Sequence, residues 1–210
     1  MKRVINLDNW NRKEHFKFFS ALDDPFWGIT TTVDFTSIYQ QSKNMEVSFF
    51  LYSVHFLLKC INATTAFKLR IENGEVVEYD KINISPTIGR EDGTFGFGFL
   101  EYDTDLSLFI ENAEKEIHRV KNSTGLSFSK DTARADVIRY SALPWFAFSE
   151  MKHAGSIQTG DSIPKISTGK LIQEKKKLLL PISISVHHGL VDGRNVAEFI
   201  QNGKDVQNNT

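Results

Sequence analysis

The fold is decided by one stretch of sequence, LLLPISISVHHGLVDG at residues 178–193. Within it, residues 182–186 alternate between apolar and hydroxyl side chains, which is typical of a strand with one buried face and one polar face. Two histidines follow at once, on a turn that carries Gly189 and Gly193. A histidine at the end of a strand, on a glycine-bearing turn, can be held rigidly with its ring toward a cleft.

The two histidines, His187 and His188, allow more than one chemistry. A neutral imidazole with a pKa of about 6.5 is the usual side chain for taking a proton from an alcohol at neutral pH. A metal site and a purely structural turn remain open as well. The metal site is the weaker alternative, because only Asp192 lies nearby and no second cluster of His, Asp or Glu has ligand spacing. Successive side chains of a strand alternate, so the two rings are expected to point in opposite directions.

Elsewhere in the chain, segments with the hydrophobic periodicity of helices alternate with segments that have the periodicity of strands. Segment 94–99 alternates aromatic residues with glycine, so a neighbouring element can pack closely on its bare face. Helices are expected at 10–20, 47–61, 106–120 and 195–201, the last with Gly203 past its end, and strands at 30–35, 67–71, 76–79, 94–99 and 178–186. These elements predict an α+β fold in which helices pack on one mixed β-sheet, as a single domain over residues 1–210.

The composition excludes several classes of protein. The 210 residues carry 25 basic and 26 acidic side chains, a balance that argues against nucleic-acid binding and membrane-surface attachment as main roles. The single cysteine, Cys60, cannot form an internal disulfide, and no apolar stretch is long enough to act as a leader or to span a bilayer. The expected location is therefore the cytoplasm. The 17 Phe, 5 Tyr and 3 Trp suit a large core or an apolar ligand pocket.

Three motifs together resemble one enzyme family. The His-His-x-x-x-Asp-Gly pattern at 187–193 resembles the signature of the chloramphenicol acetyltransferases and related CoA-dependent acyltransferases. Residues 10–16, WNRKEHF, and residues 141–145, SALPW, resemble the amino-terminal and central motifs of the chloramphenicol acetyltransferases specifically. The three motifs occur in the family's order, so the resemblance covers almost the whole chain. The related 2-oxo-acid dehydrogenase acyltransferases usually carry lipoyl and linker segments, which this sequence does not contain.

The resemblance implies an enzyme and assigns roles to four residues. It implies a homotrimer with active sites between subunits, which transfers acetyl from acetyl-CoA to a hydroxyl of chloramphenicol without a covalent intermediate and without a metal. His188 would be the general base, and Ser141 would donate a hydrogen bond to the oxyanion of the tetrahedral intermediate. Asp192 would form a buried ion pair with Arg12 and hold the turn. Acyl transfer from a thioester to an alcohol needs such a base and such a donor.

The resemblance also implies an acceptor pocket that is strongly aromatic. Carried over by position, its lining is Phe18, Phe19, Trp27, Phe95, Phe97, Phe128, Met151 and His153, with Ser167 as a polar contact. Several of these residues depart from the family: Phe19 stands where tyrosine is common, Trp27 where phenylalanine is common, and His153 where an aliphatic residue is expected. These departures leave the preferred acceptor open.

Competing interpretations remain at this point. The nearest alternative is an acetyltransferase of the same fold that acts on a different hydroxyl acceptor. A trimeric protein that sequesters an aromatic ligand without turnover is weaker, because binding alone does not require His188, Ser141, Asp192 and Arg12 together. A zinc-dependent hydrolase is weaker still. The run 175–177, three lysines, is expected to be an exposed turn, with contact to CoA phosphates as the alternative.

Overall fold

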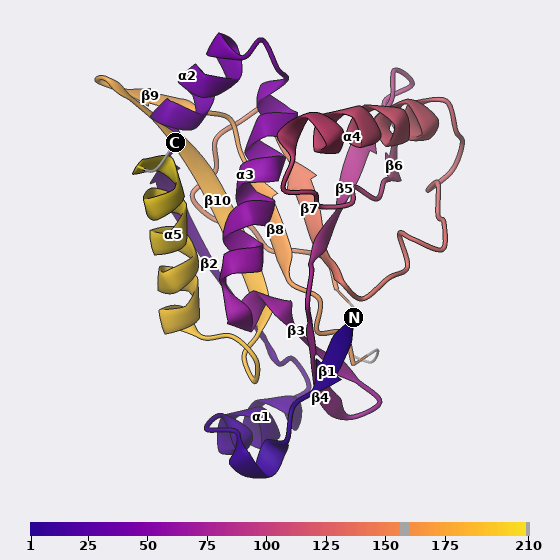
Figure 1. Ribbon diagram of the computed structural model, residues 1–210, viewed down its shortest axis with the longest axis vertical. Helices are drawn as coiled ribbons and strands as arrows, with labels where there is room; N and C mark the ends of the chain where they lie inside the picture. The colour runs from indigo at the N-terminus through magenta and orange to yellow at the C-terminus, as the bar shows by residue number, and fades with distance from the viewer. Residues whose placement is uncertain (156–159, 209–210) are drawn as a thin grey trace.

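A computed structural model describes residues 1–155 and 160–208 of the chain. Helices cover one face of a mixed β-sheet, and a smaller sheet lies beside its lower end (Figure 1). In chain order the elements are β1 (Lys2–Val4), the 3-10 helix η1 (Leu7–Asn9), α1 (Lys13–Ser20), β2 (Phe26–Asp34), α2 (Thr36–Asn44), α3 (Phe49–Ala63), the 3-10 helix η2 (Thr65–Lys68), β3 (Leu69–Glu72), β4 (Glu75–Tyr79), β5 (Asn83–Gly89), β6 (Phe95–Phe97), α4 (Leu106–Lys121), β7 (Val137–Ala142), β8 (Lys165–Thr168), β9 (Ile172–Glu174), β10 (Lys177–His187) and α5 (Gly193–Asn208).

The large sheet is mixed, as the sequence predicts. Its strand order is β2-β10-β8-β7-β5-β6, with β9 paired to the beginning of β10. Strand β10 is antiparallel to β2, β8 and β9, whereas β7 runs parallel to both β8 and β5. The three-stranded sheet β1-β4-β3 is separate, which corrects the expectation of one sheet. Its hairpin turns at Asn73-Gly74, as predicted.

The two faces of the large sheet differ in chemistry. Ile182, Ile184 and Val186 of β10 are at most 1% exposed, under the helices that Figure 1 places on one side of the sheet. The opposite face carries a row of hydroxyl side chains, because residues in register on neighbouring strands share a face. This hydroxyl row consists of Thr30, Ser183, Ser167, Ser141 and Thr87, one from each of β2, β10, β8, β7 and β5.

Several sequence-based boundaries were wrong, and two of them have an identifiable physical reason. The strand expected from residue 67 begins only at Leu69, because the chain first makes the 3-10 turn η2 and buries Phe67 completely. The last helix does not end before Gly203, which lies inside α5. A Cβ at that position would lie 3.4 Å from the ring of Phe56 and 3.6 Å from the sulfur of Cys60. Gly203 therefore lies inside α5 where that helix packs against α3, and it is not a stop signal.

The three consecutive lysines at 175–177 lie at the turn between β9 and β10. Lys175 has a φ of 53°, a left-handed conformation typical of tight hairpin turns. Lys177 forms an ion pair with Asp34, with 3.2 Å between Nζ and Oδ2. The run is the exposed turn that the sequence predicts, and a contact of these lysines with CoA phosphates stays a prediction.

The bare face of β6 is packed closely, as its glycine pattern predicts. A Cβ on Gly96 would lie 2.5 Å from a guanidinium nitrogen of Arg90 and 2.9 Å from carbons of Val120 and Ser127. The strand itself is shorter than expected and ends at Phe97. Gly96 is thus the position at which α4 and the segment after it press against the sheet.

We expect the substitution Gly96→Ala to lower the free energy of unfolding by about 1–3 kcal/mol, the usual cost of an extra methyl in a packed site. Gly89→Ala is the matched control, because a Cβ there meets nothing within 4 Å. Urea unfolding of both variants measures the difference. Equal stabilities would show that the contacts of Gly96 relax without cost.

Candidate active site

The turn that follows β10 is closed by its own backbone. We call residues 187–193 the histidine turn. The backbone N–H groups of Leu190 and Val191 both donate to the carbonyl oxygen of His187, at 3.0 Å. The carboxylate of Asp192 accepts hydrogen bonds from the backbone N–H of Arg194 and Asn195, which caps the beginning of α5. The strand, the turn and the helix are therefore one rigid unit.

Arg12 binds this unit from the other end of the chain. Its Nη1 lies 2.5 Å from Oδ2 of Asp192, and its Nη2 donates to the carbonyl oxygen of His188 at 3.2 Å. Burial of the carboxyl group raises the pKa of Asp192, but the hydrogen bond and charge of Arg12 outweigh it and leave that pKa below its usual value. The ion pair predicted between Arg12 and Asp192 is present.

The imidazole of His188 lies between two aromatic rings. The ring of Phe19 stacks on it at 3.9 Å between centroids, with 22° between the planes, and the ring of Trp27 lies at 5.3 Å. Phe18 packs edge-on against Phe19 and is 64% exposed. Within the described residues, Nδ1 of His188 is buried without a hydrogen-bond partner. Aromatic packing thus holds this ring.

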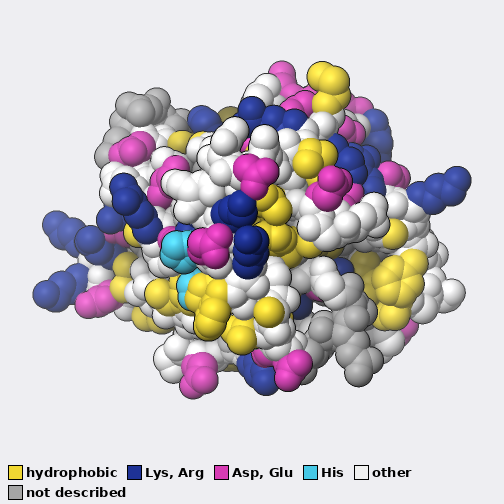
Figure 2. Space-filling view, turned by 90° about the horizontal axis from the view of Figure 1, so that it is seen from below, with side chains coloured by type: hydrophobic (Ala, Val, Ile, Leu, Met, Phe, Trp, Pro, Cys, Tyr) yellow, Lys and Arg dark blue, Asp and Glu magenta, His cyan; other side chains and the backbone are white. Residues whose placement is uncertain are grey.

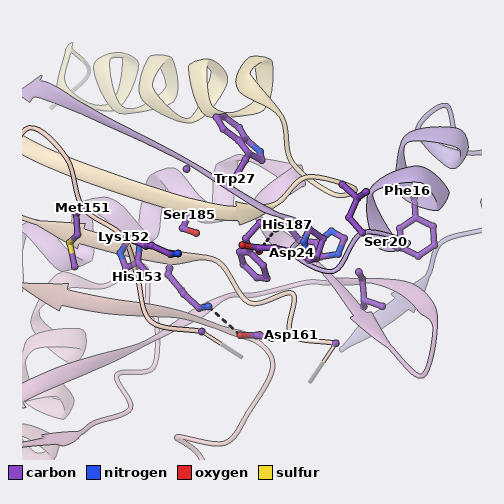
Figure 3. A pocket seen from close by; sticks show the side chains of 18 of the residues that line it. Phe16, Ser20, Asp24, Trp27, Met151, Lys152, His153, Asp161, Ser185 and His187 are labelled. Atoms are coloured by element: carbon purple, nitrogen blue, oxygen red, sulfur yellow. Dashed lines mark hydrogen bonds and ion pairs between the residues drawn. The ribbon is translucent and has the colours of Figure 1, made fainter. Parts of the chain in front are cut away.

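The neighbouring histidine points to the other side of the sheet. The ring of His187 is 4% exposed, and its Nδ1 accepts a hydrogen bond from the backbone N–H of Gly189. Burial lowers the pKa of His187 to about 4, with the nearby Asp161 opposing the shift. Figure 3 shows His187 and Ser185 beside a cavity on the open face of the sheet. The opposite orientation of the two rings agrees with the alternation along the strand.

This cavity has a volume of about 1070 Å³. Its walls come from β2, β10 and the segment that leads from β7 to β8, and an ion pair of 3.5 Å between Lys165 and Asp161 lies along one side (Figure 3). Seen from below, the surface of the molecule shows hydrophobic side chains next to exposed histidine side chains (Figure 2). Neither Lys165 nor Asp161 was identified from the sequence, because no motif marks an isolated ion pair.

Ser141 belongs to the hydroxyl row, well away from the histidine turn. The hydroxyl of Thr87 donates to Oγ of Ser141 at 3.2 Å. The next strand places Phe97 in register with Thr87. Its ring stacks on Phe128 at 5.4 Å and meets Phe95 edge-on at 5.8 Å. Thr87 therefore lies between Ser141 on β7 and the aromatic residues of β6, with Phe128 packed on one of them.

Met151, His153 and Ser167 belong to the same cluster of predicted site residues as Ser141. Ser167 is in register with Ser141 on the adjacent strand, and its Oγ lies 3.0 Å from Nε2 of His153. The backbone carbonyl of Met151 accepts a hydrogen bond from Ser183 at 3.4 Å. Burial, together with the charge of Lys165, lowers the pKa of His153.

The predicted site residues thus form two groups in one chain. The histidine group is His188 with Phe18, Phe19 and Trp27, held by Arg12 and Asp192; the serine group is Ser141 with Phe95, Phe97, Phe128, Met151, His153 and Ser167. The register places Ser141 in line with Ser183, which lies two strands away on β10. Ser183 in turn precedes His187 by four residues. At about 3.3 Å per residue and 4.8 Å per strand, the Cα atoms of Ser141 and His187 are about 16 Å apart. His188 is one residue further along and faces the other side of the sheet.

Thr87 is a hydrogen-bond partner of Ser141 that the sequence did not predict. It precedes no recognisable motif, and the strand that carries it, β5, was not predicted. Its role depends on the register between β5 and β7, which places it beside Ser141. The alternating pattern of a single strand cannot reveal such a partner.

Two features are absent from residues 1–155 and 160–208. No three His, Cys, Asp or Glu side chains come together there in a way that could hold a metal ion. None of the helices in that part of the chain has the length and apolar character that a bilayer crossing requires.

Comparison with known proteins points to one family. The profile described as chloramphenicol acetyltransferase matches residues 2–204. "Chloramphenicol acetyltransferase 3" of Escherichia coli is 27% identical over 205 residues, which cover 97% of this chain and 96% of that protein. A chloramphenicol acetyltransferase of Clostridioides difficile is 28% identical, with 93% and 91% covered. A solved structure of a chloramphenicol acetyltransferase superposes with a TM-score of 0.89 at 29% identity, over 98% of this chain and 99% of that one.

The pairing of Arg12 with Asp192 predicts coupled losses of activity. Arg12→Ala and Asp192→Asn should each loosen the histidine turn, since removing one partner of a buried ion pair typically costs about 3–5 kcal/mol; the partial exposure of this pair places it toward the low end. The double variant should lose much less activity and stability than the sum of the losses in the two single variants, because both substitutions break the same contact. Steady-state rates and urea unfolding of the three variants measure this. Strictly additive losses would mean that the two side chains act separately.

Proposed function

The chain belongs to the chloramphenicol acetyltransferase family, and we propose that it transfers the acetyl group of acetyl-CoA to a hydroxyl group of chloramphenicol. Such a transfer inactivates the antibiotic and confers resistance. The observation that carries this function is the histidine turn, which Arg12 and Asp192 hold with the His188 ring between two aromatic rings. The family match covers the residues of both site groups.

His188 is the general base of the proposed reaction. It takes the proton of the acceptor hydroxyl as the hydroxyl oxygen attacks the thioester carbonyl of acetyl-CoA. The oxygen–carbon bond forms, and the carbonyl oxygen becomes an oxyanion that accepts a hydrogen bond from the hydroxyl of Ser141. The intermediate then collapses: its carbon–sulfur bond breaks, and the proton held by His188 passes to the departing thiolate. The products are the acetyl ester and free CoA.

Thr87 supports the part assigned to Ser141. Because the Thr87 hydroxyl donates to Oγ of Ser141, the hydrogen of Ser141 is left to point elsewhere, toward a substrate oxygen. A donor that is already oriented needs no reorganisation when charge develops on the oxyanion. Thr87 is therefore a positioning residue, and Ser141 is the group that touches the reacting atoms.

The separation of the two groups supports a site shared between subunits. Strand geometry keeps Ser141 about 16 Å from the histidine turn in one chain, so a second copy has to bring its His188 to the serine group. Several large apolar side chains are open to solvent in the single chain, among them Phe128 at 70% and Trp145 at 73%. A subunit interface would cover such side chains. The family resemblance makes this assembly a homotrimer.

The aromatic rings of the serine group fit an aryl acceptor, and no nucleic acid or membrane is part of this proposal. The enzyme would act in the cytoplasm, where acetyl-CoA is supplied. An acetyltransferase with a different hydroxyl acceptor is the second candidate. It is favoured by His153, whose ring is hydrogen-bonded to Ser167 at the place where the family carries an aliphatic residue. That imidazole adds a polar contact to the acceptor pocket.

The function is tested by release of the CoA thiol from acetyl-CoA, with and without chloramphenicol. We expect release that depends on chloramphenicol and a product acetylated on a hydroxyl. In the same assay, His188→Ala should lower kcat at least ~10²–10⁴-fold, whereas His187→Ala should lower it far less. Release with another alcohol but not with chloramphenicol would favour the second candidate. A kcat near that of the wild type for His188→Ala would contradict the assignment of the base.

The Thr87 hydroxyl should matter only through Ser141. Ser141→Ala removes the oxyanion donor and should lower kcat about 10²-fold or more, with little change in KM. We expect Thr87→Val to lower kcat about tenfold in the wild-type background. It should have almost no effect once Ser141 is alanine, and Thr87→Ser should restore most of the rate. An equal effect of Thr87→Val in both backgrounds would show that Thr87 acts independently of Ser141.

A further inference from the structure

The carbonyl groups of the histidine turn accept hydrogen bonds both from the turn's own backbone and from distant side chains. The carbonyl of His187 accepts from backbone N–H groups of the turn itself. Two carbonyls are bound by side chains from distant parts of the chain: Arg12 donates to the carbonyl of His188, and the indole N–H of Trp27 donates to the carbonyl of Val191 at 2.9 Å. The turn is therefore fixed at its first residues by Arg12 and near the start of α5 by Trp27.

Trp27 is placed for this contact by the pairing of β2 with β10. It lies in register with Val186, and the pairing continues past the end of β10, where the backbone N–H of His188 donates to the carbonyl of Pro25 at 2.8 Å. Trp27 and Val186 therefore share the face of the sheet that the helices cover. Figure 3 shows the indole of Trp27 directed toward α5, while Ser185 and His187 lie beside the cavity.

The same indole also contacts the ring of His188. The centroids are 5.3 Å apart, with 40° between the planes, and Phe19 stacks on the His188 ring at 3.9 Å. Because Nδ1 of His188 has no hydrogen-bond partner in the described part of the chain, ring packing must restrict its rotation. Trp27 thus limits the position of His188 in two ways, through the backbone of the turn and through the ring.

We propose that Trp27 is a positioning residue for His188, which braces the histidine turn through the carbonyl of Val191. The proposal rests on the proposed function, in which His188 is the base. An imidazole that takes a proton in the transition state must be held within a small range of positions, and small displacements are costly in rate. Losing the N–H of Trp27 leaves a carbonyl of the turn without its donor, which loosens the turn.

The test removes the indole N–H while keeping an aromatic ring. In Trp27→Phe we expect kcat to fall about tenfold, with the KM for acetyl-CoA changed less than twofold. In the His188→Ala background the same substitution should have almost no further effect, because the group that it positions is gone. Replacing Trp27 by benzothienylalanine, which substitutes sulfur for the N–H in an otherwise similar ring, should reproduce the loss if the phenylalanine variant packs poorly. Tyr79→Phe, which removes a hydrogen-bonding hydroxyl in the small sheet, is the matched control and should leave kcat unchanged.

A second readout does not depend on turnover. Amide hydrogen exchange at Leu190 and Val191 should be at least tenfold faster in Trp27→Phe than in the wild type, with no change in β3 and β4. If the wild type acetylates no alcohol, the proposed function fails, and the exchange rates still decide whether Trp27 braces the turn. Unchanged exchange, or an equal loss of kcat with and without His188, would overturn the proposal.

Discussion

The ion pair between Arg12 and Asp192 joins the two ends of the chain, and the placement of the histidine turn depends on it. It fixes the first residues of α5 against the segment that leads into α1. Helix α1, which begins directly after Arg12, carries Phe19 onto the ring of His188. Both charges are partly withdrawn from water, so loss of either side chain leaves the other without its opposite charge. This contact thus helps to set the backbone of the turn, together with the hydrogen bond from Trp27 to the carbonyl of Val191.

The sheet imposes a second constraint. Its register aligns hydroxyl side chains of five strands in one row, and Ser141 obtains its partner Thr87 from that row. The same register separates the row from the histidine turn by several residues along β10, and alternation turns the two histidines to opposite faces. In the proposed function, one chain therefore presents the base and the oxyanion donor at separate places, and the proposed site takes one of them from a second copy of the chain.

Local patterns predicted those features of the fold that depend on neighbouring residues. The alternation at 182–186 gave the long strand, Asn73-Gly74 gave a hairpin, and the three motifs identified the family and the partner of Arg12. Features that depend on distant contacts were missed. Gly203 resembles a helix end in the sequence, because its packing against Phe56 is a contact between residues far apart in the chain. Likewise, nothing in the sequence near Thr87 indicates that its partner lies on β7. The assignment of roles to the site residues stays a prediction from the family motifs.

The central claim is that each active site combines His188 of one subunit with Ser141 of another. Subunit mixing tests it most directly, with the inactive variants His188→Ala and Ser141→Ala unfolded together and refolded as mixed trimers. In a ring of three, every mixed trimer then contains one intact site, so an equal mixture should recover about a quarter of the wild-type rate. Activity no higher than that of the two variants refolded separately would place both residues in the same chain's site and contradict the account.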